Sequence, residues 1–158
     1  MLDTDKAHYV TVTGIIIKDG KFLIVKRAPT EKTFPNKWTV PGGKLETSDY
    51  MNRPKDTSDA WYNVFETLLR REVIEETSLT IRNIRYLTDL VFIRPDGIPT
   101  IVMSLFAYHE SGEVKLCEDL TEHAWVSLEE AKNYDLIDGI YEELEMLDKL
   151  LRGKDTEE

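Results

Sequence analysis

Three glutamates at close spacing are the residues of this sequence best placed to do chemistry. Glu72, Glu75 and Glu76 occupy positions i, i+3 and i+4 of the segment Arg71–Glu76. A helix over this segment would gather the three carboxylates on one face, because residues three and four apart are neighbours on a helix. Like charges held together in this way repel one another, so the pattern indicates oxygen ligands for a cation.

The residues before the glutamates indicate which face of the helix carries them. With about 100° of rotation per residue and Trp61 taken as zero, the apolar residues fall within about 80° of it; these are Val64, Phe65, Leu68 and Leu69. The three glutamates fall within about 60° of the same zero and so continue the core-facing stripe. A solvated acidic face is the alternative for such a run, and this face assignment disfavours it.

Partly buried carboxylates without a partner pick up protons or destabilise the fold. A divalent cation removes that conflict, and a ligand set made only of oxygen favours Mg2+, with Mn2+ as a substitute. The helical pattern therefore predicts a magnesium site.

Length and composition set the broad class of the protein. The 158 residues, 41% of them hydrophobic, predict one globular domain over residues 1–158, with a core of about 8–152 and a flexible tail at 153–158. No apolar run reaches the length of a membrane span, and the first residues lack signal-peptide character. Cys117 is the single cysteine, so an internal disulfide is excluded and a cytoplasmic setting is expected.

The formal net charge of −10 bears on the class of partner. Such a charge repels polyanions and disfavours binding to a nucleic acid duplex. It leaves room for a small phosphorylated substrate, because bound metal ions would reverse the local sign of the charge. The sequence is compatible with a homodimer and does not decide how subunits pair.

The order of predicted elements indicates an α/β or α+β fold with a mixed β-sheet between helices. Asp19-Gly20 is a two-residue hairpin signal between strands 8–18 and 21–27. Ser127 is a helix cap. The remaining predicted elements are a helix at about 59–77, strands at 81–93, 99–109 and 123–126, and helices from 128 and over 137–151.

Two motifs separated by a loop resemble the Nudix box, written G-x5-E-x7-R-E-U-x-E-E-x-G-U with U a bulky apolar residue. They are Pro41-Gly42-Gly43-Lys44-Leu45-Glu46 and Arg71-Glu72-Val73-Ile74-Glu75-Glu76-Thr77-Ser78-Leu79. The flanking segments Phe22–Arg27 and Trp125–Glu130 also resemble the family, so the resemblance spans roughly Tyr9 to Leu151. It implies a Nudix-type α/β/α sandwich with a mixed sheet.

The box departs from the family pattern in two places. Lys44 to Arg70 are 27 residues, 14 more than the thirteen of the family pattern. Counting forward from Gly43 puts Asp49 at the first acidic position, and counting back from Arg71 puts Asn63 there, so no Glu fills it. We expect the insertion to lengthen the loop and the start of the helix and to leave the three ligands intact. The second departure is Ser78 at the Gly position: Gly suits a left-handed helix end there, and Ser adopts that conformation at a modest steric cost.

The resemblance implies hydrolysis of a nucleoside diphosphate linked to some group X, with Mg2+ as cofactor. In it Glu72, Glu75 and Glu76 are metal ligands, and any of them can accept the proton of the attacking water. Arg71 orients a carboxylate, and the backbone carbonyl of Gly43 is a further candidate metal ligand.

Other site residues follow from the same resemblance. Lys44 is the candidate contact for substrate phosphate, with a solvated surface lysine as the alternative. Glu46 either supports a ligand or acts on the water, or is a solvated loop carboxylate. The family often adds a carboxylate from the loop before the Trp-containing strand. Glu118, Asp119 and Glu122 lie there, and Glu118 is our choice among residues that the sequence does not separate.

Arg27, Phe34 and Trp38 could form a pocket for the base or sugar, although core packing accounts for Trp38 equally well. The leading hypothesis is a MutT-type enzyme that cleaves a (d)NTP to the monophosphate and pyrophosphate. ADP-ribose and nucleotide sugars are the alternative substrates. A non-catalytic Nudix-like nucleotide sensor is the competing class, and such domains typically lose the glutamates that this chain keeps.

Overall fold

The computed structural model describes residues 1–157, with side chains as far as Gly153. Its β-strands are β1 (Tyr9–Lys18), β2 (Lys21–Arg27), β3 (Trp38–Thr39), β4 (Gly42–Lys44), β5 (Thr80–Ile93), β6 (Pro99–Ser111) and β7 (Leu120–Val126). Its helices are the 3-10 helix η1 (Thr47–Asp49) and the α-helices α1 (Val64–Thr77), α2 (Leu128–Ala131) and α3 (Ile140–Glu157).

Within the described residues, seven strands form a mixed sheet around β1. The main order is β3-β2-β1-β6-β5, β4 pairs with β1, and β7 pairs with β2. β1 and β6 run parallel, whereas the other neighbours are antiparallel. The β1–β2 hairpin turns at Asp19 and Gly20, which have φ angles of 50° and 76°, as the predicted two-residue turn requires.

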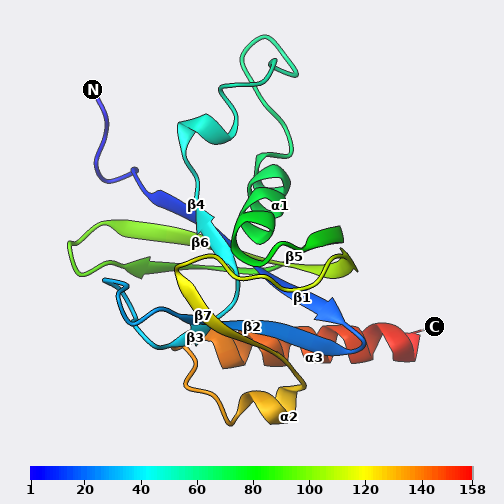
Figure 1. Ribbon diagram of the computed structural model, residues 1–158. Helices are drawn as coiled ribbons and strands as arrows, with labels where there is room; N and C mark the ends of the chain where they lie inside the picture. Colours follow the sequence, from blue (N-terminus) through cyan, green and yellow to red (C-terminus); the bar gives the residue numbers. More distant parts are fainter. Residues whose placement is uncertain (158) are drawn as a thin grey trace.

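Helices cover both faces of the sheet (Figure 1). α1 packs Leu68, Leu69 and Val73 on one face, in a core that includes Val12 of β1. α3 packs on the other face, where its buried leucines join the Ile15 side of the same strand. Side chains of β1 point alternately to the two faces of the sheet and so take part in both hydrophobic cores. The predicted α/β/α sandwich with a mixed sheet is confirmed.

The helix that carries the glutamates begins later than predicted. Its first residue is Val64, and Asn63 before it has a left-handed φ of 58°. Trp61, our zero for the helical face, lies outside the helix: its Nε1 donates to the Arg53 carbonyl, and its ring packs on Tyr50 at a centroid distance of 5.1 Å. The insertion therefore lengthens the loop and not the start of the helix, contrary to our expectation. Hydrogen bonds within the loop hold these residues in a non-helical conformation.

The end of α1 agrees with the expectation for Ser78. This residue has a φ of 67°, and its N–H donates to the Ile74 carbonyl over 2.9 Å. Its hydroxyl donates to the Lys115 carbonyl at 3.1 Å, a bond that offsets part of the left-handed strain. Ser127 caps α2 by accepting from the Glu130 N–H, as predicted.

The last helix starts at Ile140, after Gly139 with its positive φ of 95°, and not at the predicted residue 137. The predicted flexible tail, 153–158, falls on the end of this helix and on Glu158, which lies outside the described residues. Among residues 1–157 no helix is both long and apolar enough to cross a membrane.

Candidate active site

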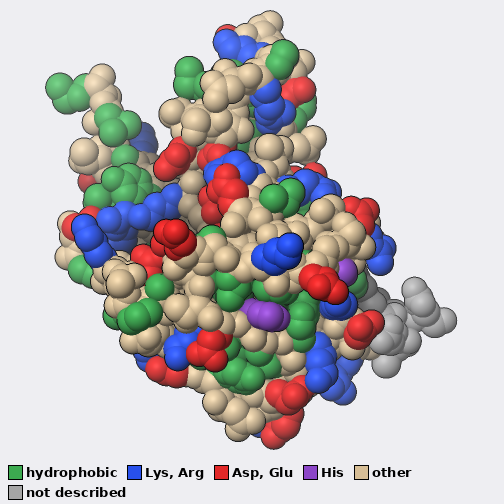
Figure 2. Space-filling view, viewed as in Figure 1, with side chains coloured by type: hydrophobic (Ala, Val, Ile, Leu, Met, Phe, Trp, Pro, Cys, Tyr) green, Lys and Arg blue, Asp and Glu red, His purple; other side chains and the backbone are tan. Residues whose placement is uncertain are grey.

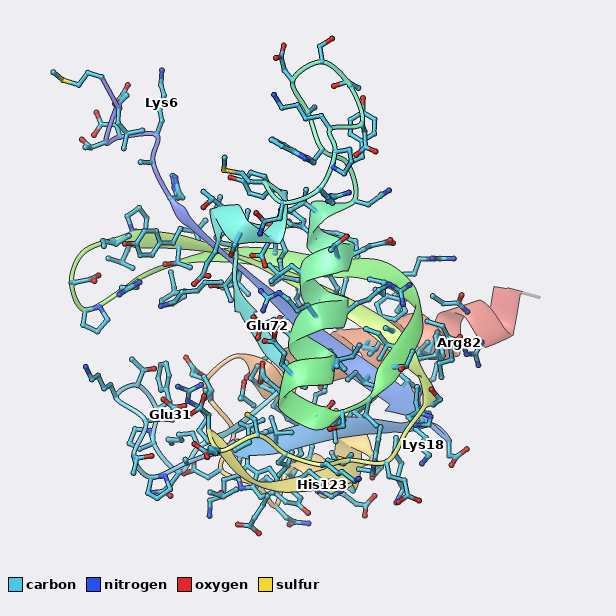
Figure 3. The ribbon with its side chains drawn as sticks, turned by 45° about the horizontal axis from the view of Figure 1, so that its top comes forward. Lys6, Lys18, Glu31, Glu72, Arg82 and His123 are labelled. Atoms are coloured by element: carbon cyan, nitrogen blue, oxygen red, sulfur yellow. The ribbon has the colours of Figure 1, made fainter. Side chains whose placement is uncertain are left out.

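Helix α1 and strand β4 bring the two motifs into direct contact. Gly43 pairs with Val12 of β1, so its missing side chain would point toward α1. A Cβ atom on Gly43 would lie 2.3 Å from Cδ of Glu72, so any side chain there would push the Glu72 carboxyl away from β4. The N–H of Gly42 donates to Oε1 of Glu76 at 3.2 Å. Figure 3 shows Glu72 pointing from α1 toward this strand.

Glu72 and Glu76 are half-buried, whereas the Glu75 side chain is 57% exposed. Burial raises the pKa of Glu76 to about 8, and the neighbouring Glu72 carboxyl acts in the same direction against the Gly42 hydrogen bond. Burial also raises the pKa of Glu72, although the Arg71 guanidinium opposes that shift. Burial thus disfavours the charged form of both carboxyls, and a nearby positive charge would stabilise that form.

The exposure of Glu75 corrects the predicted face. The buried residues of α1 centre near Leu69, about 80° from the zero that we set at Trp61. On this corrected frame Glu76 lies about 20° from the centre of the buried face and Glu75 about 120° from it. The error arose because Trp61 lies outside the helix.

Arg71 joins the three carboxylates that surround it. Its Nη2 lies 2.6 Å from Oδ1 of Asp49 and 3.1 Å from Oε1 of Glu72, and its Nη1 lies 3.0 Å from Oε2 of Glu75. The other oxygen of Asp49 accepts the Glu46 N–H at 2.7 Å. Asp49 was not among the predicted site residues. The sequence did contain a signal for it, because counting forward from Gly43 places Asp49 at the first acidic position of the family pattern.

The glutamates line a cavity of about 300 Å³ at the end of α1. Its walls are Arg27, Glu31, Gly42, Glu72, Glu75, Glu76, Cys117, Asp119 and Leu120. Figure 3 shows Glu31 on the loop after β2, across from α1. Among the described residues no three acidic, His or Cys side chains converge as a metal cage. Glu72 and Glu75 instead turn to Arg71, and Glu76 turns to Gly42.

The residue types of this cavity nevertheless fit a hard divalent cation. Its acidic walls offer carboxylate oxygens, the ligands that Mg2+ and Mn2+ prefer. Two of these carboxylates have raised pKa values, and the absence of a side chain at Gly43 lets the Glu72 carboxyl lie against β4.

The structure separates the two adjacent acids that the sequence left open, Glu118 and Asp119. Asp119 lines the cavity, whereas Glu118 does not, because the chain turns between Cys117 and Leu120 to enter β7. Glu122 is further along β7 and pairs with Lys26 at 3.2 Å.

Arg27 lies in the carboxylate cavity, as its candidate role requires. Its Nε donates to the Thr33 carbonyl at 2.9 Å, and its charge lowers the pKa of Glu76. Trp38 does not line the cavity: its ring is 8% exposed and packs edge-on against Tyr134 at 4.8 Å. The pocket prediction for Trp38 is therefore wrong, because β3 pairs with β2 and directs this ring into the core.

The loop after β2 also lines a second cavity of about 500 Å³, because Glu31 borders the first cavity and Lys32 and Thr33 border the second. It is lined by Thr11, Lys32, Thr33, Phe34, Lys44, Phe92, Arg94, Pro95, Asp96 and Thr100. Lys44 follows Gly43 in β4, so its side chain points to the opposite face of the strand from the carboxylates. Glu46 lines a third cavity of about 490 Å³, next to Lys44 and Tyr50. Thr33, which holds Arg27, connects the first cavity to the second.

The comparisons with known proteins agree with this geometry. A family model described as a NUDIX domain matches residues 8–147. The nucleoside triphosphatase NudI of Escherichia coli O17:K52:H18 (strain UMN026 / ExPEC) is 28% identical over 139 residues, covering 79% of this chain and 86% of that protein.

Two solved structures share the fold. A MutT NUDIX hydrolase from Burkholderia pseudomallei matches with a TM-score of 0.70 and 22% identity, covering 89% of this chain and 98% of that one. The NUDIX domain of Shewanella oneidensis NrtR, solved in complex with ADP ribose, matches with a TM-score of 0.71 and 18% identity, covering 92% and 90%. Since the family model spans most of the sequence, the chain belongs to the Nudix hydrolase family.

Proposed function

We propose that this hydrolase cleaves a nucleoside triphosphate to the monophosphate and pyrophosphate in a reaction that depends on Mg2+. The observation that carries the proposal is the contact of the Glu72 and Glu76 carboxyls with the Gly42-Gly43 strand, beside a cavity large enough for a nucleoside. The name of the E. coli relative, a nucleoside triphosphatase, supports the choice of substrate. The compartment in this proposal is the cytoplasm, because a lone cysteine forms no internal disulfide.

The carboxylates of Glu72, Glu75 and Glu76, the Gly43 carbonyl and the Asp119 carboxylate would hold the metal. When bound, Mg2+ or Mn2+ screens the charge of the phosphates and lowers the pKa of a bound water. Arg71 holds Glu72 and Glu75 in place from one side, so two of the ligands are oriented before substrate arrives.

The reaction requires a water to attack phosphorus while a P–O bond of the α–β bridge breaks. The proton of that water passes to one of the three carboxylates, and the leaving phosphate oxygen takes up the bridging electron pair. Arg27 lies in the same cavity and supplies positive charge toward the phosphates. The catalytic contribution of the chain is thus positioning and electrostatic stabilisation.

The second cavity suits the nucleoside. Phe34 and Phe92 offer aromatic faces for a base, and Phe34 is 50% exposed despite its size. Lys32 and Lys44 line the same space, and neither pairs with an acidic side chain within the described residues. In a chain with a net charge of −10, two such unpaired lysines in one cavity favour an anionic ligand.

The deciding experiment is a substrate panel with Mg2+ that separates pyrophosphate release from phosphate release. The panel holds the ribo- and deoxynucleoside triphosphates, ADP-ribose and a nucleotide sugar. Turnover of a triphosphate with pyrophosphate release is the expected result. Cleavage of ADP-ribose or the sugar alone would transfer the assignment to those substrates, and binding without turnover would identify a nucleotide sensor.

The site is tested by Glu75→Gln and Glu76→Gln in the same assay. We expect each to lower kcat by roughly 100-fold or more, as the loss of a group that binds an essential metal does. Glu66→Gln is the matched control, because Glu66 lies in the first turn of the same helix and is exposed. Full activity of both test variants would remove these residues from the site.

A further inference from the structure

The outer edge of the sheet carries an exposed apolar strip. β5 is the last strand of the main sheet order, and among the described residues β6 is its only partner strand along residues 86–93. Its large apolar side chains are unusually exposed there: Tyr86 54%, Leu90 37%, Val91 56%, Phe92 42% and Ile93 65%. Successive residues point to opposite faces, so both faces of the edge are apolar.

An edge of this kind is rarely left open in a natural protein. Edges are normally protected by lysines, prolines, bulges or a covering element, because their free N–H and C=O groups recruit other strands. The edge strip Tyr86–Ile93 has one charged residue, Asp89, and its carboxylate already accepts the Tyr86 hydroxyl. The last register shift of β5 lies between Tyr86 and Thr88, at the start of the strip, and residues 88–93 after it form a regular ladder.

We propose that the edge strip pairs with the same strip of a second copy of this chain. Two identical edges pair antiparallel about a two-fold axis, and opposed residues then share a face of the joined sheet. An axis at Val91 places Leu90 opposite Phe92 and Asp89 opposite Ile93. The four consecutive apolar residues then lie at the centre of the contact, and no like charges oppose each other.

The charge of the protein favours a copy of itself over a charged partner at this strip. Two copies with a net charge of −10 repel each other, so they can approach only where the surface is locally near neutral. The edge strip meets that condition, with one acidic residue in eight. A basic protein or nucleic acid would gain nothing from it, because the strip offers backbone hydrogen bonds and apolar area alone.

The size of the strip predicts a weak dimer. With the axis at Val91, residues 89–93 of the two copies oppose each other over about 17 Å, and side chains on both faces give roughly 300 Å² per copy, or about 600 Å² in total, the size of a weak, transient contact. We therefore expect dissociation in the micromolar range. Added salt strengthens the association, since it screens the repulsion of the two copies and leaves the apolar contact intact.

The experiment is sedimentation velocity over about 1 to 300 µM protein, at low and at high NaCl concentration. Val91→Lys is the test variant, because a lysine on an edge strand blocks pairing and Val91 points away from the face that carries Phe92 and the nucleoside cavity. Met146→Lys on α3 is the matched control, with a similar exposed fraction of 46%. Thermal melting confirms that both variants fold.

We expect a concentration-dependent dimer for the unaltered chain and the control, and at least a tenfold weaker one for Val91→Lys. In the unaltered chain, dimer formation should also slow the amide hydrogen exchange of β5, so the exchange should be slower at high protein concentration than at low. A monomer at every concentration and salt level would overturn the proposal, as would a dimer that Val91→Lys leaves unchanged. This test uses no substrate, so it is independent of the proposed reaction.

Discussion

Oδ1 of Asp49 lies 2.6 Å from Nη2 of Arg71 and 3.0 Å from its Nε, and the Asp49 side chain is only 3% exposed. The two residues are 22 positions apart, and the insertion loop lies between them. Asp49 thus occupies the position where the family pattern has its first Glu, counted from the glycines, and the extra residues follow it. The insertion leaves the support of Arg71 intact because it enters after this carboxylate.

Asp49 should accordingly act as a positioning residue for the glutamates. Asp49→Ala removes both hydrogen bonds to Arg71 and frees it to turn away from Glu72 and Glu75. We expect kcat to fall by about 10- to 100-fold with a much smaller change in KM, as for other residues that orient metal ligands. Steady-state kinetics with Mg2+ measure this split.

The control for this variant is Asp59→Ala, an exposed acid in the same loop. It should match the unaltered chain in kcat. Asp49→Glu keeps a carboxylate and should recover part of the activity. If Asp49→Ala changed KM and left kcat alone, Asp49 would belong to substrate binding and not to the positioning of Arg71.

Gly43 should tolerate no side chain. Its Cβ would lie within 2.8 Å of three carboxyl atoms of Glu72, so Gly43→Ala must displace that carboxyl from β4. We expect a drop of roughly 100-fold in kcat/KM with little change in the free energy of unfolding, because the displaced atoms are the end of a flexible side chain and not part of the packed core. Gly153→Ala is the control, since no described atom outside its own helix turn lies within 4 Å of the added methyl group, and it should unfold at the same temperature or slightly higher. Equal kinetics for both variants would contradict the close packing of Glu72.

The sequence predicted the parts of the site that depend on local spacing. The Glu72–Glu76 cluster, the glycine turn and the left-handed end at Ser78 all follow from short-range geometry, and the structure shows the local geometry that each requires. The start of α1 was predicted less well. Residues 59–63 have acceptable helix propensity, but their backbone bonds within the loop, and Asn63 takes a left-handed conformation that stops the helix.

Residues placed by long-range pairing were beyond the sequence pattern. Glu118 and Asp119 are adjacent acids, and only the turn into β7 decides which of them reaches the cavity. Trp38 is directed inward by the pairing of β3 with β2, which no local signal specifies. The role of Asp49 required knowing on which side of it the extra residues lie, and a count along the chain gives two equal answers.

Glu143 predicts a stability that falls as pH rises. It is 7% exposed on α3, and its Oε1 has no hydrogen-bond partner among the described residues. Burial raises the pKa of its carboxyl, while the nearby Ser104 hydroxyl opposes the shift. A folded-state pKa above the unfolded value means that the folded state holds its proton longer. Ionisation therefore destabilises the fold, and the loss begins as pH rises through the unfolded pKa and is complete above the folded pKa.

Glu143→Gln removes that cost because the amide stays neutral. We expect it to raise the free energy of unfolding by about 1 kcal/mol at pH 7, the order of one unsatisfied buried polar group, and to change it little near pH 4. Urea unfolding at the two pH values provides the measurement. Glu145→Gln, an exposed acid on the same helix, should show no such difference. A Gln variant less stable than the parent at pH 7 would mean that the carboxylate has a stabilising partner.

Phe34 should contribute to nucleoside binding and not to chemistry. It lines the second cavity in a left-handed conformation with a φ of 49° and is half exposed, so its ring is held toward solvent by the loop. Phe34→Ala should raise KM by roughly 10-fold with kcat nearly unchanged, the pattern of lost uniform binding. Tyr62→Ala is the control, an aromatic of similar exposure in the insertion loop and outside this cavity. Steady-state kinetics on the preferred substrate measure KM and kcat of both variants. An equal rise in KM in the two variants would argue against stacking of the base on Phe34.

The insertion loop can be divided into an anchoring part and a tip. Deleting 47–56 removes Asp49 with the rest of the anchoring part, so we expect this deletion to lower kcat on every substrate, by at least the factor of Asp49→Ala. The tip is different: Asp56 N–H bonds the Ala60 carbonyl at 2.9 Å, so its ends already meet. Replacing 56–60 by Asn-Gly keeps Asp49 and the Tyr50–Trp61 contact, and should preserve kcat within about twofold while Mg2+ titration gives the same midpoint. A large loss of kcat in the tip variant would show that the whole loop, and not Asp49 alone, orders Arg71.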